Sequence, residues 1–195
     1  MWKKNVYRQP RTKHAGKIEL FTGLLAVFLV VLVMLVCLKL SHFMIAGAYM
    51  EDALAASNLA SALIDIEEYG KSHTLRIKDP QAAYEIYKEA LSINLGLDEE
   101  GQSSQKALLE GPVKILSYMI YNVENDRVNV FSLSEGENMQ QLPSGELGQI
   151  YTPDGILVET TTIYSRISFR VKGLGKQYIY AEKEKSVDVK RNEEE

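Results

Sequence analysis

The dominant pattern in the chain is an uninterrupted run of nineteen uncharged, almost wholly apolar residues from Leu20 to Leu38. As a helix with a rise of about 1.5 Å per residue, the run spans about 28 Å, close to the thickness of a bilayer's hydrocarbon core. Residues 1–17 carry six basic side chains and no acid, whereas Glu51 and Asp52 come early on the far side. The asymmetry predicts a basic cytoplasmic tail over residues 1–17 and a transmembrane helix over residues 18–40, with an extracytoplasmic remainder.

A cleaved signal peptide is the alternative interpretation, because the small residues Ala46, Gly47 and Ala48 resemble a cleavage site. The apolar core of a signal peptide usually has about 7 to 15 residues and lies close to that site. Here the run is longer, is followed by Lys39 and lies well before the small residues. We therefore expect a retained single-pass anchor in the cell membrane, with the lipid bilayer as its first partner.

Helix-forming residues continue past the anchor and predict a helical extension over residues 41–70, ending at Gly70. Part of the extension has apolar residues at i, i+3, i+4 and i+7, with small side chains around them. Two partners are open for this surface: the chain's own sheet, which is the simpler choice, and a neighbouring helix in an assembly. The candidate helix-packing residues are Ala56, Leu59, Ala60, Leu63 and Ile66.

Residues 71–191 are predicted to form one extracytoplasmic α+β domain, followed by an acidic tail at residues 192–195. Asp79 as N-cap, Pro80 at the first helical position and Gly96 after the last apolar residue mark a second helix. Residues 98–111 are expected to form a polar connection.

From Pro112 onward the pattern is that of strands. Residues 115–123 and 127–133 flank a short polar turn and predict a hairpin, whose first strand is apolar on both sides and therefore central. A second strand pair is expected over residues 161–171 and 177–189, joined at Gly173, Leu174 and Gly175. In the first of these two strands apolar and polar residues alternate, so that one face should be buried and the other solvated. The predicted fold class is α+β: a long N-terminal transmembrane and amphipathic helix, a second helix, and a C-terminal antiparallel meander of four or five strands.

Charge and composition narrow the range of possible functions. The formal net charge of −4 combines +6 from residues 1–17 with −10 from the rest, so no basic surface for nucleic acid is expected outside the membrane. The only cysteine, Cys37, lies within the apolar run, which leaves the domain without disulfides or thiol chemistry. Of three histidines only His73 belongs to the domain, where a surface loop position is expected. We expect no catalytic, cofactor-binding or metal-binding site and no small-molecule substrate.

A short basic tail, one apolar helix with an acid near its start (Glu19), an amphipathic extension and a terminal antiparallel sheet together resemble type IV pilin-like proteins. The arrangement is most similar to the TadE-like minor pilins, or pseudopilins, of tight-adherence systems. The segment from Lys17 to Gly70 carries most of the resemblance. It implies that membrane helices stack into a bundle with other pilin-like subunits, while exported domains decorate it.

The resemblance also implies processing by a prepilin peptidase after Gly16, with Glu19 neutralising the new N-terminus of a neighbouring subunit. Glu19 lies three residues after Gly16, whereas the family places its acid five residues after the glycine, where this chain has Phe21. The other interpretation of Glu19 is an interfacial carboxylate beside Lys17.

Three functions remain open at this point. The first is a non-catalytic structural subunit of a bacterial surface pilus or secretion-associated assembly, which the resemblance favours. The second is a single-pass, membrane-anchored extracytoplasmic binding or scaffold protein. The third is an exported enzyme, which the poverty of His and Cys disfavours.

Overall fold

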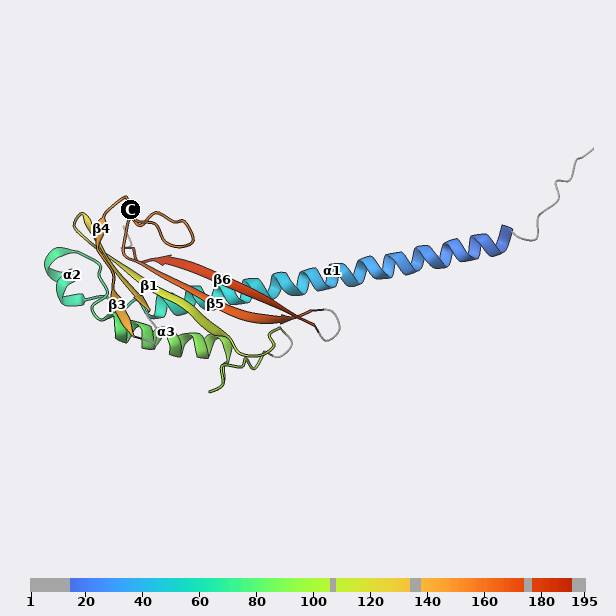
Figure 1. Ribbon diagram of the computed structural model, residues 1–195, viewed down its shortest axis with the longest axis horizontal. Coiled ribbons are helices and arrows are strands. Elements are labelled where there is room, and N and C mark those ends of the chain that lie inside the picture. Colours follow the sequence, from blue (N-terminus) through green and yellow to red (C-terminus); the bar gives the residue numbers. More distant parts are fainter. Residues whose placement is uncertain (1–14, 106–107, 134–137, 174–176, 191–195) are drawn as a thin grey trace, which may run out of the picture. The chain divides into compact units, whose positions relative to one another are not determined.

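The computed structural model describes residues 15–105, 108–133, 138–173 and 177–190 (Figure 1). The chain divides into two compact units, Met1–Ser41 and His42–Glu195. Several sequence predictions lie outside the described residues: residues 1–14 of the basic tail, the Leu174 and Gly175 positions of the second hairpin turn, and the acidic tail at residues 192–195.

The first unit contains the N-terminal part of helix α1 (Ala15–Ala60). Every residue from 16 to 38 is exposed, and α1 is the one helix among the described residues that is long and apolar enough to cross a membrane. A helix suits the interior of a bilayer because it satisfies its backbone hydrogen bonds within itself. Even the hydroxyl of Thr22 is satisfied locally, donating to the Ile18 carbonyl oxygen at 2.8 Å. The first unit is thus compatible with a single-pass membrane anchor.

The C-terminal end of α1 corrects the predicted extension over residues 41–70. α1 ends at Ala60, and Gly70 lies inside a separate short helix, α2 (Ile66–Ser72). The cap of α2 is His73, which adopts the left-handed conformation at φ 56° and donates its backbone N–H to the Tyr69 carbonyl. Gly70 is therefore an ordinary helical residue.

The break between α1 and α2 has a tertiary cause. The backbone N–H of Asp65 donates to the Arg76 carbonyl at 2.9 Å, and Ile64 forms a β-bridge with Ile77. The Asp65 carboxylate then accepts from the backbone N–H of Glu68 at 3.2 Å, as an N-cap does. Pairing with a distant segment overrides the helix propensity of the residues before α2.

Helix α3 (Pro80–Leu95) forms where its capping residues predict it. The Asp79 carboxylate accepts from the backbone N–H groups of Gln81 and Ala82, both at 3.0 Å. Gly96 ends the helix at φ 57°, a left-handed conformation that glycine adopts without a Cβ penalty.

The rest of the domain is built on one antiparallel sheet, which confirms the α+β class. Its strands are β1 (Lys114–Glu124), β2 (Arg127–Leu133), β3 (Met139–Gln141), β4 (Gly145–Glu146), β5 (Thr162–Lys172) and β6 (Tyr178–Asp188). They are ordered β3-β2-β1-β5-β6, and β4 pairs with β2 beside β3. Both predicted hairpins form, β1 with β2 and β5 with β6. The first turns through Asn125 at φ 55°.

The order of the strands differs from the predicted meander. After β4 the chain returns to the other side of β1, where β5 pairs with it. β1 is central, as its two apolar faces predict, and a central strand needs a neighbour on each side. The sequence predicts that β1 has a second neighbouring strand but does not identify that strand as β5.

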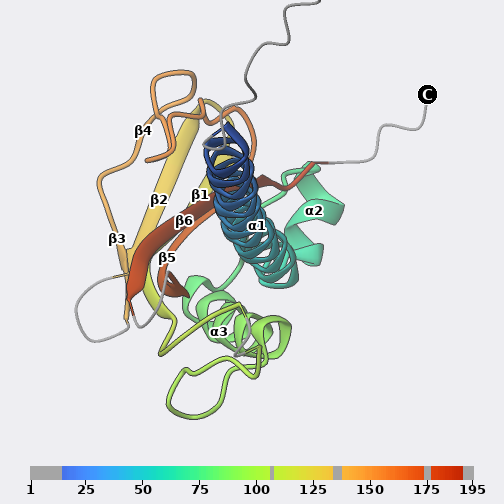
Figure 2. The ribbon, with the colours of Figure 1, turned by 90° about the vertical axis from the view of Figure 1, so that its right-hand side faces the viewer.

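The sheet is covered on both faces. One face packs against α1 and α3 in the main core, which includes Met50, Leu54, Tyr87, Ile120 and Ile167. α1 and α3 lie side by side in this layer, and Figure 2 shows both helices with the sheet. The other face carries a smaller cluster of Tyr121, Val128, Val130, Val158 and Tyr164, with Leu147 and Ile150 packed against it. The face of β5 predicted to be solvated is therefore partly buried, because the connection before β5 covers it.

Candidate functional site

The candidate site lies on α1, and the two sides of its domain segment differ sharply. The buried side faces the domain's own core and carries Ala46, Met50, Ala53, Leu54, Ser57 and Asn58, and Ser61 continues it in the turn directly after α1. These positions recur every three or four residues, the spacing of one helical face. Small residues at Ala53 and Ser57 bring the α1 backbone close to the sheet and to α3.

Polar side chains fix the buried side in one register. Asn58 Nδ2 donates to the Lys185 carbonyl on β6 at 2.9 Å, and Asn94 Nδ2 on α3 donates to Ser57 Oγ at 3.1 Å. The hydroxyl of Tyr118 on β1 donates to Ser61 Oγ at 2.8 Å. These bonds attach α1 to three other elements of the domain, so this part of α1 behaves as a fixed component of the fold.

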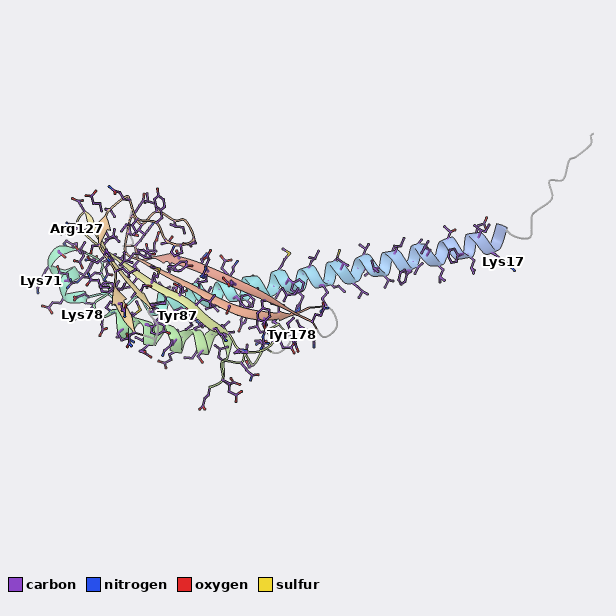
Figure 3. All side chains as sticks on the ribbon, in the orientation of Figure 1. Lys17, Lys71, Lys78, Tyr87, Arg127 and Tyr178 are labelled. Carbon is purple, nitrogen blue, oxygen red and sulfur yellow. The ribbon has the colours of Figure 1, made fainter. Side chains whose placement is uncertain are left out.

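Burial keeps the tyrosines of this core protonated. It raises the pKa of the Tyr118 phenol well above its ordinary value, although the bond with Ser61 acts in the opposite direction. Tyr87, which lies between α3 and the sheet (Figure 3), has its pKa raised for the same reason. Tyr84 stacks on Tyr87, and Tyr118 packs at a tilt against both rings, with centroids 4.6 Å apart for Tyr87 and Tyr118. The protonated Tyr118 phenol serves as a structural donor within this packed aromatic group.

An ion-pair cluster ties the same segment to β6. Glu51 lies 2.9 Å from Lys183 and 2.8 Å from Lys185, measured between carboxylate oxygens and ammonium nitrogens. The hydrogen bonds from Lys185 and Lys183, together with their charges, lower the pKa of Glu51 to about 2. One carboxylate on α1 thus bridges two lysines on the same face of β6.

The five residues predicted for helix packing all lie on the solvent side of the domain. Ala56, Leu59 and Ala60 belong to the exposed side of α1, whereas Leu63 and Ile66 follow it in the turn and in α2. Leu59 is 63% exposed and Ile66 82% exposed, so the domain's own sheet does not cover them. The domain's own sheet, the simpler of the two partners expected from sequence, thus covers small residues of this segment such as Ala53 and Ser57 but not the five named positions. We call Ala56, Leu59 and Ala60 the outer face of α1.

The turn after the outer face is held by a charged group around Arg76. Its guanidinium lies 3.1 Å from Asp65, 3.3 Å from Glu124 and 4.0 Å from Glu68. The capping bond from Glu68, followed by the bond from Arg76, lowers the pKa of Asp65, although burial opposes it. In the same cluster, hydrogen bonds with Asp65 and Glu124 raise the pKa of Arg76. The end of α1 is consequently anchored to β1.

The predicted processing residues occupy the first turns of α1. Gly16 and Glu19 are both helical and exposed, and a Cβ added at Gly16 would meet nothing within 4 Å. Both residues belong to the first unit, whereas the outer face of α1 belongs to the second.

Catalytic chemistry has little support among the described residues. They contain no group of three or more His, Cys, Asp or Glu side chains placed to bind a metal ion. His73 is exposed and packs edge to face against Tyr69. An open surface hollow of about 600 Å³ includes His73, Glu159, Thr161 and Lys190 in its lining. The Thr161 hydroxyl there is already engaged, donating to the Leu75 carbonyl and accepting from the Val123 N–H.

Sequence reasoning missed the residues that decide which side of α1 is buried. Ser57, Asn58 and Ser61 interrupt an alanine- and leucine-rich helix, and polar residues recurring at helical spacing were the available signal. Their partners Asn94 and Lys185 come from elements far away in the chain. No local pattern identifies such partners.

Comparisons of the chain with protein-family models, with curated proteins and with solved structures find no match.

Proposed function

We propose that this chain is a non-catalytic, pilin-like structural subunit of a bacterial surface pilus or secretion-associated assembly. In this proposal α1 anchors the subunit in the cell membrane with the N-terminus in the cytoplasm, and the sheet domain lies outside. The observation that carries the proposal is the outer face of α1, which stays exposed on a helix whose opposite side is fixed to its own domain.

The composition of the outer face suits a helix of a neighbouring subunit. Ala56 and Ala60 are one helical turn apart and let a second backbone approach closely, while Leu59 beside them supplies apolar area. The exposed apolar residues from 16 to 38 would pack on the same neighbours inside the bilayer. Contiguous exposed apolar surface of this kind marks an interaction site in soluble and membrane proteins alike.

The first turns of α1 add the second part of the proposal. Gly16 and Glu19 are exposed, so both are accessible to a processing enzyme or a neighbouring subunit. Cleavage after Gly16 would give a mature chain that starts at Lys17. A carboxylate carried into the bilayer costs a few kcal/mol without a partner, and a neighbour's new ammonium group would offset that cost.

Cysteine cross-linking in membranes tests the outer face. Cys37 is the only cysteine, so Cys37→Ala gives a clean background. In that background Ala56→Cys is expected to form disulfide-linked dimers on mild oxidation. The matched control is Ala53→Cys, which lies three residues away on the buried side and should not cross-link.

The second test is the intact mass and N-terminal sequence of the protein extracted from native membranes. A start at Lys17, together with cross-linking at Ala56, is the expected result for a processed pilin-like subunit. A chain that starts at Met1 and gives no dimer from either cysteine variant would contradict the assembly proposal. That outcome would favour a permanently anchored binding or scaffold protein instead.

A further inference from the structure

A second exposed apolar surface lies at the turn end of the β5–β6 hairpin, where β5 ends and β6 begins. Tyr178, Ile179 and Tyr180 are all exposed at the start of β6, and Figure 3 shows Tyr178 at this end of the hairpin. Across the strand pair, the Arg170 guanidinium carbon lies 5.6 Å from the ring centre of Tyr178 and 5.8 Å from that of Tyr180. Lys172, which pairs with Tyr178, is also exposed. Aromatic and cationic side chains thus share one end of the domain, which we call the hairpin end.

Contacts within the domain show at which end of the domain segment of α1 the hairpin end lies. At the other end of β6, Val189 donates to the Thr161 carbonyl, and Thr161 in turn donates to Leu75. That segment continues to Ile77, which bridges to Ile64 just after α1. The C-terminal end of β6 therefore lies near the C-terminal end of α1, and the hairpin end points the opposite way.

The ion pair between Glu51 and Lys183 aligns β6 with α1 and so shows which residue of α1 lies at the same height as the hairpin end. From Lys183 back to Tyr178 is five residues of strand, or about 17 Å. From Glu51 back to His42 is nine residues of helix, or about 14 Å. The hairpin end is therefore level with His42, where the domain begins. Ala181, between Tyr178 and Lys183, packs against the core cluster that contains Ala46, as this register requires.

Chain length then limits the distance between the hairpin end and the bilayer. His42 comes only four positions after Leu38, the last residue of the apolar run. Four residues span at most about 14 Å even when fully extended. The polar layer of a bilayer is about 5–8 Å thick on each side of the hydrocarbon core. The domain's first residue is consequently held within or just beyond the headgroup layer.

The side chains of the hairpin end match that layer. Tyrosine has an apolar ring and a polar hydroxyl, and it is enriched where hydrocarbon meets headgroups. Arg170 and Lys172 add positive charge that attracts anionic headgroups. Arg170 makes no salt bridge within the described part of the chain and stacks on the two tyrosine rings instead.

We infer that the hairpin end, formed by Tyr178, Ile179, Tyr180, Arg170 and Lys172, docks on the headgroup layer of the bilayer that holds α1. This contact would restrain the domain's tilt on the membrane and so orient the outer face of α1. The inference rests on the membrane anchor of the proposed function but not on assembly with other subunits.

Tryptophan quenching tests this docking with the full-length chain. The only tryptophan, Trp2, is first replaced by phenylalanine, and one reporter is then introduced as Tyr180→Trp. The matched control is Tyr151→Trp, because Tyr151 is 60% exposed and Tyr180 76% exposed. Tyr151 belongs to the far end of the domain. Three residues after it, the Asp154 carboxylate accepts a hydrogen bond from the Ser186 hydroxyl. Ser186 lies eight residues along β6 from Tyr178, which is about 26 Å.

Each variant is reconstituted into vesicles of phosphatidylcholine and phosphatidylglycerol, with and without a headgroup spin-labelled phosphatidylcholine as quencher. The expected result is co-flotation of both variants with the vesicles and quenching about threefold stronger at position 180 than at position 151. Co-flotation with equal quenching would overturn the docking and leave the anchor standing. Emission at 180 that shifts to the blue with protein density, without quenching, would assign the surface to a second copy. Failure to co-float would overturn the anchor and the docking together.

Discussion

The ion pairs of Glu51 offer the sharpest test of how α1 is attached to its domain. Glu51→Gln keeps the size and polarity of the side chain but removes the charge that Lys183 and Lys185 share. Since this carboxylate is the only one placed between the two lysines among the described residues, the variant leaves two neighbouring cations without a partner. We expect a loss of stability at neutral pH.

The magnitude follows from the pKa of Glu51, which falls from 4.5 to about 2 in the folded protein. A shift of that size corresponds to about 3 kcal/mol before screening. Glu51 is 39% exposed, so solvent reduces the contribution to about 1 kcal/mol. Because the folded-state pKa is lowered, the stabilisation is fully present above pH 4.5 and is lost as the pH falls toward 2.

The assay is denaturant unfolding of the full-length protein in detergent, followed by circular dichroism between pH 2 and pH 7. Wild type should exceed Glu51→Gln by about 1 kcal/mol at pH 7, and the two curves should converge near pH 2. The control is Glu67→Gln, which removes a 2.7 Å pair with Lys71 that lies within α2 and is highly exposed. It should change stability by no more than about 0.5 kcal/mol. A wild-type advantage that stays constant down to pH 2 would refute the ion-pair explanation.

Four further variants probe the fold and the assembly. Asn122→Ala removes a side chain that bonds both the N–H and the carbonyl of Ile77 at 2.9 Å, and it should cost about 2–3 kcal/mol in the same unfolding assay. Asp79→Ala removes the α3 cap and should cost about 1 kcal/mol, seen as a melting temperature about 2–4 °C lower; an unchanged melting temperature would contradict the capping role. Ala53→Leu should destabilise the domain by about 1–3 kcal/mol through overpacking, whereas Ala56→Leu should leave unfolding unchanged and abolish dimer formation in membranes. Equal effects of Ala53→Leu and Ala56→Leu on unfolding would show that the outer face belongs to the domain's own core.

Local signals identified most elements of the fold correctly. The apolar run, the Asp79 and Gly96 caps and the polar turn before Arg127 each act through a few neighbouring residues, so their outcome can be read in the chain. The α+β class and both hairpins follow from such signals. The candidate packing residues could also be named from sequence, as small and apolar positions at helical spacing.

The sequence does not show what packs against these candidate positions. Ser57, Asn58 and Ser61 turn one side of α1 toward the domain, because their partners come from α3, β1 and β6. The outer face is exposed as a consequence, although its sequence is as apolar as that of the buried side. The helix also stops at Ala60 because the residues before α2 pair with a strand-like segment around Ile77.

Local sequence signals are enough to predict the long apolar helix, the α+β class and most of the elements, because periodicity, capping and turn chemistry are properties of short segments. Tertiary structure alone decided the strand order, the end of α1 and which of its two sides faces solvent. These depend on contacts between residues that are from 11 to 127 positions apart, and the energy of such contacts exists only once the chain has brought the partners together.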